Sequence, residues 1–234
     1  MVEGPSDEAL LGEYLKQKYK NQYIKFDIKH GDVFYNQKTN KESIKNTIGN
    51  SIKSIIKKQK YKQSDILAVM HILDTDGCFI DDEYIEINEN QQSKTWYNSD
   101  SISVNSEKQK ENISHRNKKR SINIRTMNSI DSVVGKQYYY QLYYFSRTME
   151  HVIFNEPNPQ NETKYTNIEE FIISLKISLE NYLSDFSPII TARPYSNKYK
   201  ESWQFIEQKT NSLKRYANVP LLFQAIDTKV SEIQ

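Results

Sequence analysis

Residues 66–73 restrict the possible folds of this chain more than any other segment. Their sequence, Ile-Leu-Ala-Val-Met-His-Ile-Leu, is almost entirely apolar and is followed by Asp74-Thr75-Asp76-Gly77. A short continuous apolar run that stops at a polar turn is typical of a central parallel strand covered on both faces. The sequence therefore predicts an α/β fold around a buried, mainly parallel sheet.

The segments before this run alternate between strand and helix patterns. Residues 1–3 read as a very short buried strand, and Gly4-Pro5-Ser6 ends it. Ser6 is a suitable cap for a helix that follows. Residues 22–29 alternate as a strand does, and residues 42–60 carry an isoleucine stripe at helical spacing. The order strand, helix, strand, helix, strand predicts a parallel sheet flanked by helices, in which ligands bind beyond the carboxyl ends of the strands.

The remainder of the chain is less clearly patterned. The polar residues 88–119 are interpreted as a long loop or partly disordered insertion. A strand is predicted at 137–145, a short helix at 148–154, a capping box at Thr166-Asn167-Ile168-Glu169 before a helical run at 171–183, and a helix at 200–216. This organisation predicts a core at residues 1–154, with its polar insertion at about 88–125, and a mainly helical region at residues 155–234.

Composition excludes several classes of protein. A net charge of +2 gives no global attraction for nucleic acid, so any basic surface must be local. The single cysteine, Cys78, excludes an intramolecular disulfide framework and a multi-cysteine zinc site, and it fits a reducing cytoplasm. No run of about 18 apolar residues and no signal-peptide pattern is found, so we expect a cytoplasmic protein without a membrane partner.

Acidic side chains follow two of the predicted strands. Glu3 ends the first strand, and Asp74 and Asp76 follow the apolar run. If these strands are neighbours in a parallel sheet, the three carboxylates meet at one edge, where they repel one another unless a cation lies among them. Alternate residues at a strand exit point to the same side, so Asp74 and Asp76 are both expected to face Glu3.

Such a set of hard oxygen ligands suits Mg²⁺ or Mn²⁺. One or two metal ions there could bind a phosphate and activate water, and Glu3 could instead transfer a proton as a general acid or base. Asp7, one turn into the first helix, is a further candidate ligand. A lone Asp-x-Asp-Gly sequence is usually only a turn, so the signal depends on the two acidic clusters occurring together.

Other polar residues have simpler explanations beside functional ones. The run Asp81-Asp82-Glu83 is typical of a solvated loop, and His71 of a satisfied core histidine, whereas His151 is ambiguous. A basic segment could contact nucleic-acid phosphates or could be a solvated surface; its candidate contacts are Arg116, Lys118, Lys119 and Arg120. The tyrosines of 138–144 could stack bases, although alternation in a half-buried strand also explains them.

Val2-Glu3-Gly4-Pro5-Ser6-Asp7 together with Leu73-Asp74-Thr75-Asp76-Gly77 resembles the two signature motifs of the Toprim domain. The form of the first motif is most similar to that of OLD-like and standalone Toprim nucleases of bacterial anti-phage defence. The resemblance covers roughly the first third of the chain. It implies that Glu3 is an acid/base or metal ligand, that Asp74 and Asp76 bind metal with Asp7 as the second acid of the first motif, and that Gly31 ends the second strand.

The resemblance implies a nuclease that uses Mg²⁺ or Mn²⁺ to hydrolyse the phosphodiester bonds of DNA or RNA. Some relatives act beside an ABC-type ATPase, and this chain has no Gly-x-x-x-x-Gly-Lys-Ser/Thr loop of its own. The alternative is a non-catalytic Toprim-fold effector or regulatory subunit bound to a partner ATPase. A different phosphoryl-transfer enzyme on the same core is a third reading, and assembly as a homo-oligomer stays open.

Overall fold

The computed structural model describes residues 1–20, 26, 31–36, 42–159 and 164–232. Most of the strand predicted at residues 22–29 lies outside them. The helices are α1 (Pro5–Lys18), α2 (Ile44–Gln59), α3 (Glu107–Asn128), α4 (Met149–Phe154), α5 (Lys164–Ser174), α6 (Leu179–Ser184), α7 (Tyr195–Ile206) and α8 (Pro220–Ser231), with 3-10 turns at Gln63–Asp65, Asp82–Tyr84 and Asn211–Leu213. No helix in these ranges is both long and apolar enough to cross a bilayer.

The strands form two small sheets. In the central sheet, β1 (Val69–Asp74) pairs in parallel with β6 (Tyr138–Phe145), which also pairs with the short antiparallel β5 (Ser132–Val133). In the second sheet, β4 (Ile102–Val104) is the middle strand. It pairs in parallel with β2 (Ile85–Ile87) and in antiparallel with β3 (Thr95–Tyr97). The predicted mixed α/β fold with flanking helices and a helical C-terminal part is confirmed, whereas the sheets are small and only partly parallel rather than mainly parallel.

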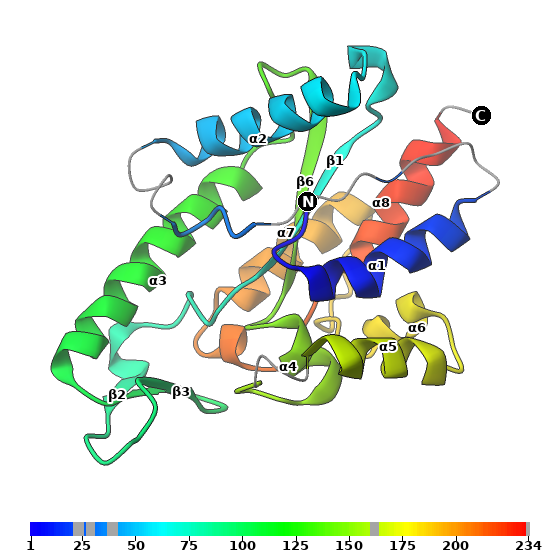
Figure 1. The fold of residues 1–234 in the computed structure, drawn as a ribbon. Helices are drawn as coiled ribbons and strands as arrows, with labels where there is room; N and C mark the ends of the chain where they lie inside the picture. Colours follow the sequence, from blue (N-terminus) through cyan, green and yellow to red (C-terminus); the bar gives the residue numbers. More distant parts are fainter. Residues whose placement is uncertain (21–25, 27–30, 37–41, 160–163, 233–234) are drawn as a thin grey trace.

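The central sheet is covered on both faces, as the apolar run predicts. Ile72 and Tyr143 pack with side chains of α1, α4 and α8, whereas the next residues along each strand, Leu73 and Tyr144, pack with α2, α3 and α7. Figure 1 shows α3 to the left of β1 and β6, with α1 and α8 to the right. Four of the five tyrosines of β6 are therefore core residues: Tyr138 is buried, Tyr140, Tyr143 and Tyr144 are fully buried, and Tyr139 is half-buried.

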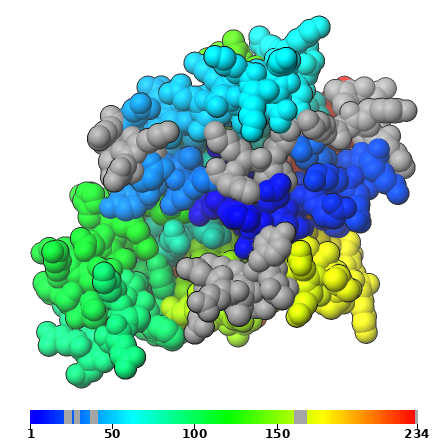
Figure 2. All heavy atoms as spheres, in the orientation of Figure 1, coloured from blue at the N-terminus to red at the C-terminus, as the bar shows by residue number. Residues whose placement is uncertain are grey.

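The N-terminal residues extend this sheet beside β1. The Met1 amino group donates to the Met70 carbonyl, and the Ile72 amide donates to the Met1 carbonyl at 2.9 Å, which is the pattern of a parallel pair. On the other side, the Glu3 carbonyl accepts a hydrogen bond from the Gly31 amide at 3.0 Å. In the space-filling view, the dark-blue N-terminal atoms lie in the middle of the visible face (Figure 2). Residues 1–3 and 31 thus reach the edge at which β1 ends.

The interpretation of residues 88–119 as a loop is wrong. This segment contains β3, β4 and the first half of α3, whose N-cap Ser106 accepts a hydrogen bond from the Gln109 amide at 3.3 Å. The inner face of α3 carries polar side chains among its apolar ones: Asn117, Arg120, Ser121 and Asn123 are buried beside Ile113, Ile124 and Met127. A helix that buries polar residues shows little amphipathic pattern, and this hides it from sequence analysis.

Three predicted helix boundaries are also wrong. The first helix is capped by Gly4 with Pro5 at its first position, rather than by Ser6. The run at 171–183 is two helices, α5 and α6, and α5 begins at Lys164, ahead of the predicted capping box. The helix expected at 200–216 is α7, which ends at Ile206, and the later helix α8 was not predicted. The boundary near residue 155 stays a prediction, although α6, α7 and α8 pack on the same sheet as α1 to α4.

Candidate metal centre

The turn that follows β1 is locked to the turn that follows β6. The Asp76 amide donates to the Arg147 carbonyl at 2.9 Å, and the Arg147 amide donates to the Thr75 hydroxyl at 2.6 Å. Both Asp76 and Arg147 adopt a left-handed backbone, with φ of 50° and 61°. This conformation is uncommon for residues with a side chain and is found in turns that have a function. The two strand exits therefore form one rigid unit.

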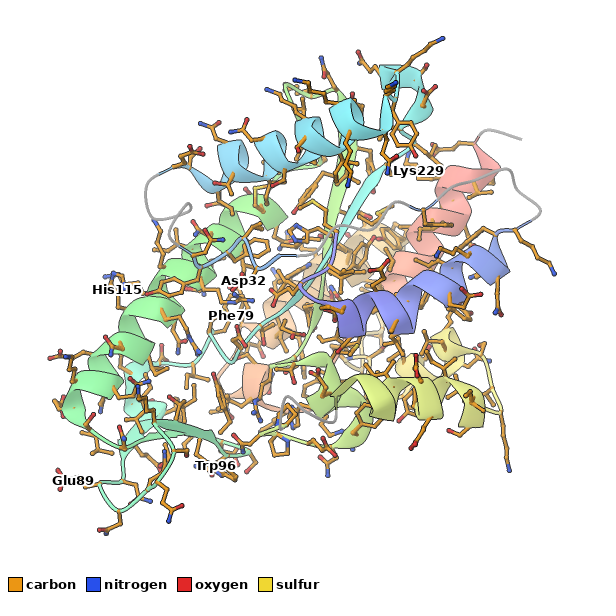
Figure 3. The ribbon with its side chains drawn as sticks, viewed as in Figure 1. Asp32, Phe79, Glu89, Trp96, His115 and Lys229 are labelled. Carbon is orange, nitrogen blue, oxygen red and sulfur yellow. The ribbon has the colours of Figure 1, made fainter. Side chains whose placement is uncertain are left out.

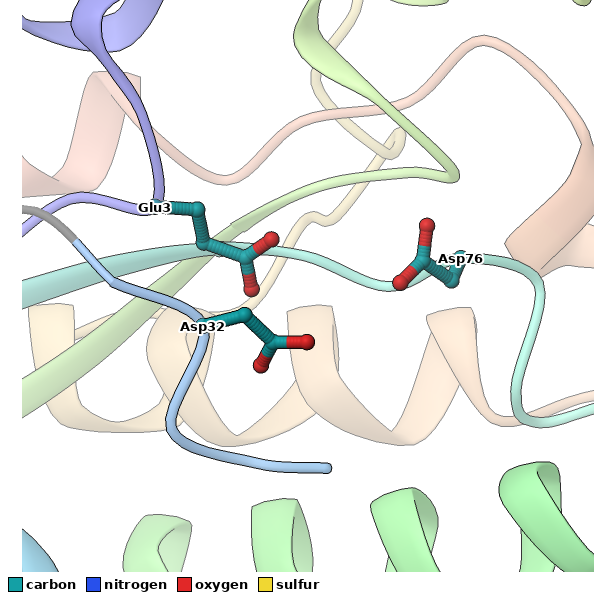
Figure 4. Close-up of side chains that lie close together, drawn as sticks. All are labelled: Glu3, Asp32 and Asp76. Carbon is teal, nitrogen blue, oxygen red and sulfur yellow. The ribbon is translucent and has the colours of Figure 1, made fainter. Parts of the chain in front are cut away.

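Three carboxylates from separate segments meet beside this unit. Glu3, Asp32 and Asp76 each have an oxygen that lies within 4.8 Å of an oxygen of the other two. Figure 4 shows the side chains of the three residues turned toward a common space, and Figure 3 places Asp32 near the middle of the molecule, beside α3. The side chains of Asp32 and Asp76 are 38% and 30% exposed, so the cluster is open to solvent on one side.

The guanidinium of Arg120 is the internal cation of this cluster. This fully buried residue of α3 donates to Glu3 Oε1 at 2.6 Å and to Asp32 Oδ2 at 2.8 Å, and its Nη2 lies 3.4 Å from Asp76 Oδ2. It also donates to the Asp74 carbonyl at 2.5 Å. One guanidinium in contact with three carboxyl groups leaves two excess negative charges when all three are ionised. Burial raises the pKa of Glu3 well above its usual range, and Arg120 opposes that shift while the neighbouring aspartates add to it.

Asp74 and Asp7, which the sequence also proposed as ligands, have backbone partners. Asp74 Oδ1 accepts a hydrogen bond from the Met149 amide at 3.0 Å, at the start of α4. Asp7 Oδ2 accepts one from the Gly4 amide at 2.8 Å. Burial raises the pKa of Asp74 well above its usual range, and the nearby charges of Asp7, Glu3, Asp76 and Glu150 raise it further. Asp74 thus lies close enough to the cluster to share its field.

Asp74 and Asp76 do not follow the alternation of a strand. Asp74 is the last residue of β1, whereas Asp76 lies in the turn that follows and has a left-handed backbone. The direction of the Asp76 side chain is therefore not set by the alternation of the strand. The sequence therefore identified Glu3 and Asp76, whereas it missed Asp32 as a member of the cluster. The available signal was weak: Asp32 follows His30-Gly31 at the end of a predicted strand, the same kind of position that Glu3 and Asp74 occupy.

The basic residues proposed as nucleic-acid contacts separate into two pairs on α3. Arg120 is buried in the cluster, and the Nη2 of Arg116 donates to the Asp76 carbonyl at 2.9 Å. Lys118 is exposed and Lys119 is half-buried. The role of Lys118 and Lys119 as contacts to a nucleic-acid backbone stays a prediction.

His71 and Cys78 are core residues. His71 is fully buried and its Nδ1 lies 2.9 Å from the Tyr140 hydroxyl, whereas its Nε2 has no hydrogen-bond partner among the described residues. It is therefore a core histidine, but only one of its ring nitrogens is satisfied. Cys78 is buried, and burial raises the pKa of its thiol to about 12, which makes it a poor nucleophile.

The donor set of the cluster fits a hard divalent cation. Carboxylate oxygens are the ligands that Mg²⁺ and Mn²⁺ prefer, and the two excess charges match one such ion. No nitrogen or sulfur ligand belongs to the group within the described residues, which disfavours a zinc site.

Comparisons with family models, with curated proteins and with solved structures find no match to this chain.

Proposed function

We propose that this protein is a metal-dependent nuclease that hydrolyses phosphodiester bonds of DNA or RNA. The observation that carries the proposal is the cluster of Glu3, Asp32 and Asp76 beside the carboxyl end of β1, with oxygens within 4.8 Å of one another. Ligands of open α/β sheets bind at this edge. A role in bacterial anti-phage defence, and the Toprim identity of the core, rest on the resemblance of the two acidic motifs.

Each residue has a defined task in this proposal. Glu3, Asp32 and Asp76 hold Mg²⁺ or Mn²⁺, while Asp74 and Asp7 add negative potential from positions fixed by the amides of Met149 and Gly4. A divalent ion held by these residues would supply Lewis-acid chemistry for the phosphate and for an attacking water. Arg120 keeps the carboxylates in place by its contacts to Glu3 and Asp32. Lys118 and Lys119 attract the nucleic-acid backbone.

We expect Asp76→Asn to reduce cleavage by about 100-fold or more, because the change removes a charged ligand while keeping the size of the side chain. The measurement is cleavage of plasmid, single-stranded DNA and total RNA in Mg²⁺ and in Mn²⁺. Glu83→Gln is the matched control, because Glu83 is an exposed acid in the same connection between β1 and β2. This variant should cleave at the wild-type rate. Equal rates for the two variants would refute the assignment of the site.

A non-catalytic subunit is the second candidate, and the position of Arg120 favours it. A guanidinium at 2.6 Å from Glu3 and 2.8 Å from Asp32 already supplies a positive charge where a metal ion would bind. This reading predicts no calorimetric signal for Mn²⁺, no cleavage by the purified chain, and co-purification with an ATPase. Saturable Mn²⁺ binding that Asp32→Asn weakens would exclude it.

Metal affinity is expected to rise with pH. Because burial raises the pKa of Glu3 and of Asp74, these carboxyls retain protons at a higher pH than usual, and a protonated carboxyl is a poor ligand. Each proton that the metal displaces contributes up to about tenfold in affinity per pH unit below that pKa. Calorimetric titration of Mn²⁺ at about pH 5.5 and about pH 7.5 measures this dependence, and Asp74→Asn should make it less steep.

A further inference from the structure

Arg147 is a buried cation with no hydrogen-bonded anion within the described part of the chain, although the negative charges of Asp76 and Asp74 act on it. The residue follows β6 and is only 2% exposed, and its Nε and Nη1 make no hydrogen bond within the described part of the chain. Its Nη2 reaches Asn158 Oδ1 at 3.5 Å, which is a long contact. Burial lowers the pKa of this guanidinium to about 10, so it stays charged at neutral pH. A buried charge of this kind is destabilising unless an opposite charge joins it.

The backbone of Arg147 is held in an unfavourable conformation next to the acidic cluster. Its φ is 61°, and hydrogen bonds to Thr75 and from Asp76 fix it to the turn that carries Asp76. Strain that the surrounding structure enforces is typical of ligand-binding positions. The contrast with Arg120 is informative, because Arg120 is equally buried but contacts three carboxylates.

An aromatic ring supports the guanidinium. The central carbon of Arg147 lies 4.1 Å from the centroid of the Tyr97 ring. The Tyr97 amide and carbonyl both pair with the side chain of Asn158, at 3.0 Å each, and the Tyr97 hydroxyl accepts a hydrogen bond from Arg116 at 2.8 Å. Stacking on a ring uses the face of a guanidinium and leaves its edge donors available. Arg116 adds a second positive charge beside the same ring.

We propose that Arg147 binds a phosphate group of the nucleic-acid strand that Glu3, Asp32 and Asp76 act on. This inference rests on the proposed function for the identity of the strand. Binding requires Asn158 to leave Nη2 and the atoms that now cover the buried Nε to move as well. Nε and Nη2 then present one edge of the fork to two phosphate oxygens, the geometry in which arginine binds phosphate most strongly. Because Asp76 and Arg147 are hydrogen bonded through their backbones, the phosphate on Arg147 fixes the register of the strand at the carboxylates.

The test is a binding experiment without metal. A fluorescein-labelled single-stranded octanucleotide is titrated in EDTA and followed by fluorescence anisotropy. We expect Arg147→Gln to weaken binding about 10-fold or more, because a charge-assisted, two-oxygen contact is lost, and Arg147→Lys to weaken it less. Arg125→Gln is the control: Arg125 also lies on an aromatic ring, that of Phe79 at 5.4 Å, but it is exposed and already paired with Glu207 at 2.8 Å. It should change affinity by less than about twofold.

Competitors identify the source of the phosphate. Inorganic phosphate and adenosine monophosphate should displace the octanucleotide from the wild type at millimolar concentration and should have no such effect on Arg147→Gln. Displacement by the mononucleotide at much lower concentration than the strand itself would overturn the assignment to a strand. Binding of the octanucleotide and of inorganic phosphate that is unchanged in both Arg147→Gln and Arg147→Lys would overturn the phosphate site.

Failure of the nuclease proposal is separable from failure of this one. A wild type that binds the octanucleotide through Arg147 but cuts nothing in Mg²⁺ or Mn²⁺ supports the phosphate site and contradicts the nuclease. Circular dichroism and thermal unfolding show that the variants are folded. Arg147→Gln should unfold at the wild-type temperature or above it, because it removes a buried charge that has no hydrogen-bonded anion. If it does not fold, Arg147→Lys carries the same comparison.

Discussion

Arg120→Met is expected to lower the free energy of unfolding by about 3–5 kcal/mol, the range found when one partner of a buried ion pair is removed. Arg120 is fully buried and contacts Glu3 at 2.6 Å, Asp32 at 2.8 Å and Asp76 at 3.4 Å. Methionine fills a similar volume, so the loss of charge dominates the effect. Urea unfolding in EDTA, followed by circular dichroism, measures it. The three carboxylates are then left without the guanidinium that balances them.

The matched control is Arg125→Met on the same helix. Its guanidinium pairs with Glu207 at 2.8 Å, but its side chain is 51% exposed, and exposed pairs contribute about 0–1 kcal/mol. Mn²⁺ should restore much of the stability that Arg120→Met loses, because an ion that binds only the folded state stabilises it by mass action. Equal destabilisation in the two variants would contradict the role of Arg120 as the balancing cation. No effect of Mn²⁺ on Arg120→Met would contradict the metal site.

Gly77→Ala should destabilise the protein by about 2–5 kcal/mol. Gly77 has a φ of +66°, which costs about 1–2 kcal/mol for a residue with a side chain. A Cβ there would also lie 2.5 Å from Cδ2 of the fully buried Leu213, and overpacking of this kind costs about 1–3 kcal/mol. The same turn carries Asp76, so metal affinity should fall as well. Thermal and urea unfolding of the variant measure the first effect.

Gly135→Ala isolates the contribution of the contact with Leu213. Gly135 has nearly the same φ, +67°, but nothing lies within 4 Å of the position of an added Cβ. It should cost only the backbone term of about 1–2 kcal/mol. The double variant Gly77→Ala/Leu213→Ala removes the Leu213 side chain that the new Cβ would contact. It should lose less stability than the sum of the two single variants, because Leu213→Ala relieves the overpacking that Gly77→Ala causes. Equal costs at Gly77 and Gly135 would show that Leu213 moves aside freely.

The fold was predictable where the sequence pattern and the packing have the same period. The continuous apolar run became β1 because both faces of that strand are covered, and the isoleucine stripe of α2 faces the core at Ile44, Ile48 and Ile52. Helix α3 was not predictable in this way. Its inner face is used to position Arg120 and to bury Asn117 and Asn123, so the residues that make it functional also weaken its amphipathic signal.

The candidate site was only half visible in the sequence for a similar reason. Glu3 and Asp76 stand next to recognisable strand ends, whereas Asp32 belongs to the cluster because Gly31 hydrogen bonds to the Glu3 carbonyl, a contact between segments. Arg120 was read as part of a basic surface, because neighbouring charges in sequence look alike. Only the orientation of the helix separates the buried guanidinium from the exposed Lys118.

The pair between Glu3 and Arg120 joins residues 117 positions apart. A ribosome that adds about 5–20 residues per second needs roughly 6–23 s to pass from one to the other. Asp32 and Asp76 are added during that interval, so all three acids of the cluster precede their guanidinium, and β6, the strand beside β1, has also not been made. The segment around Glu3 therefore cannot form its ion pair until residue 120 has been made. Nascent chains stalled before residue 120 should remain sensitive to protease around Glu3.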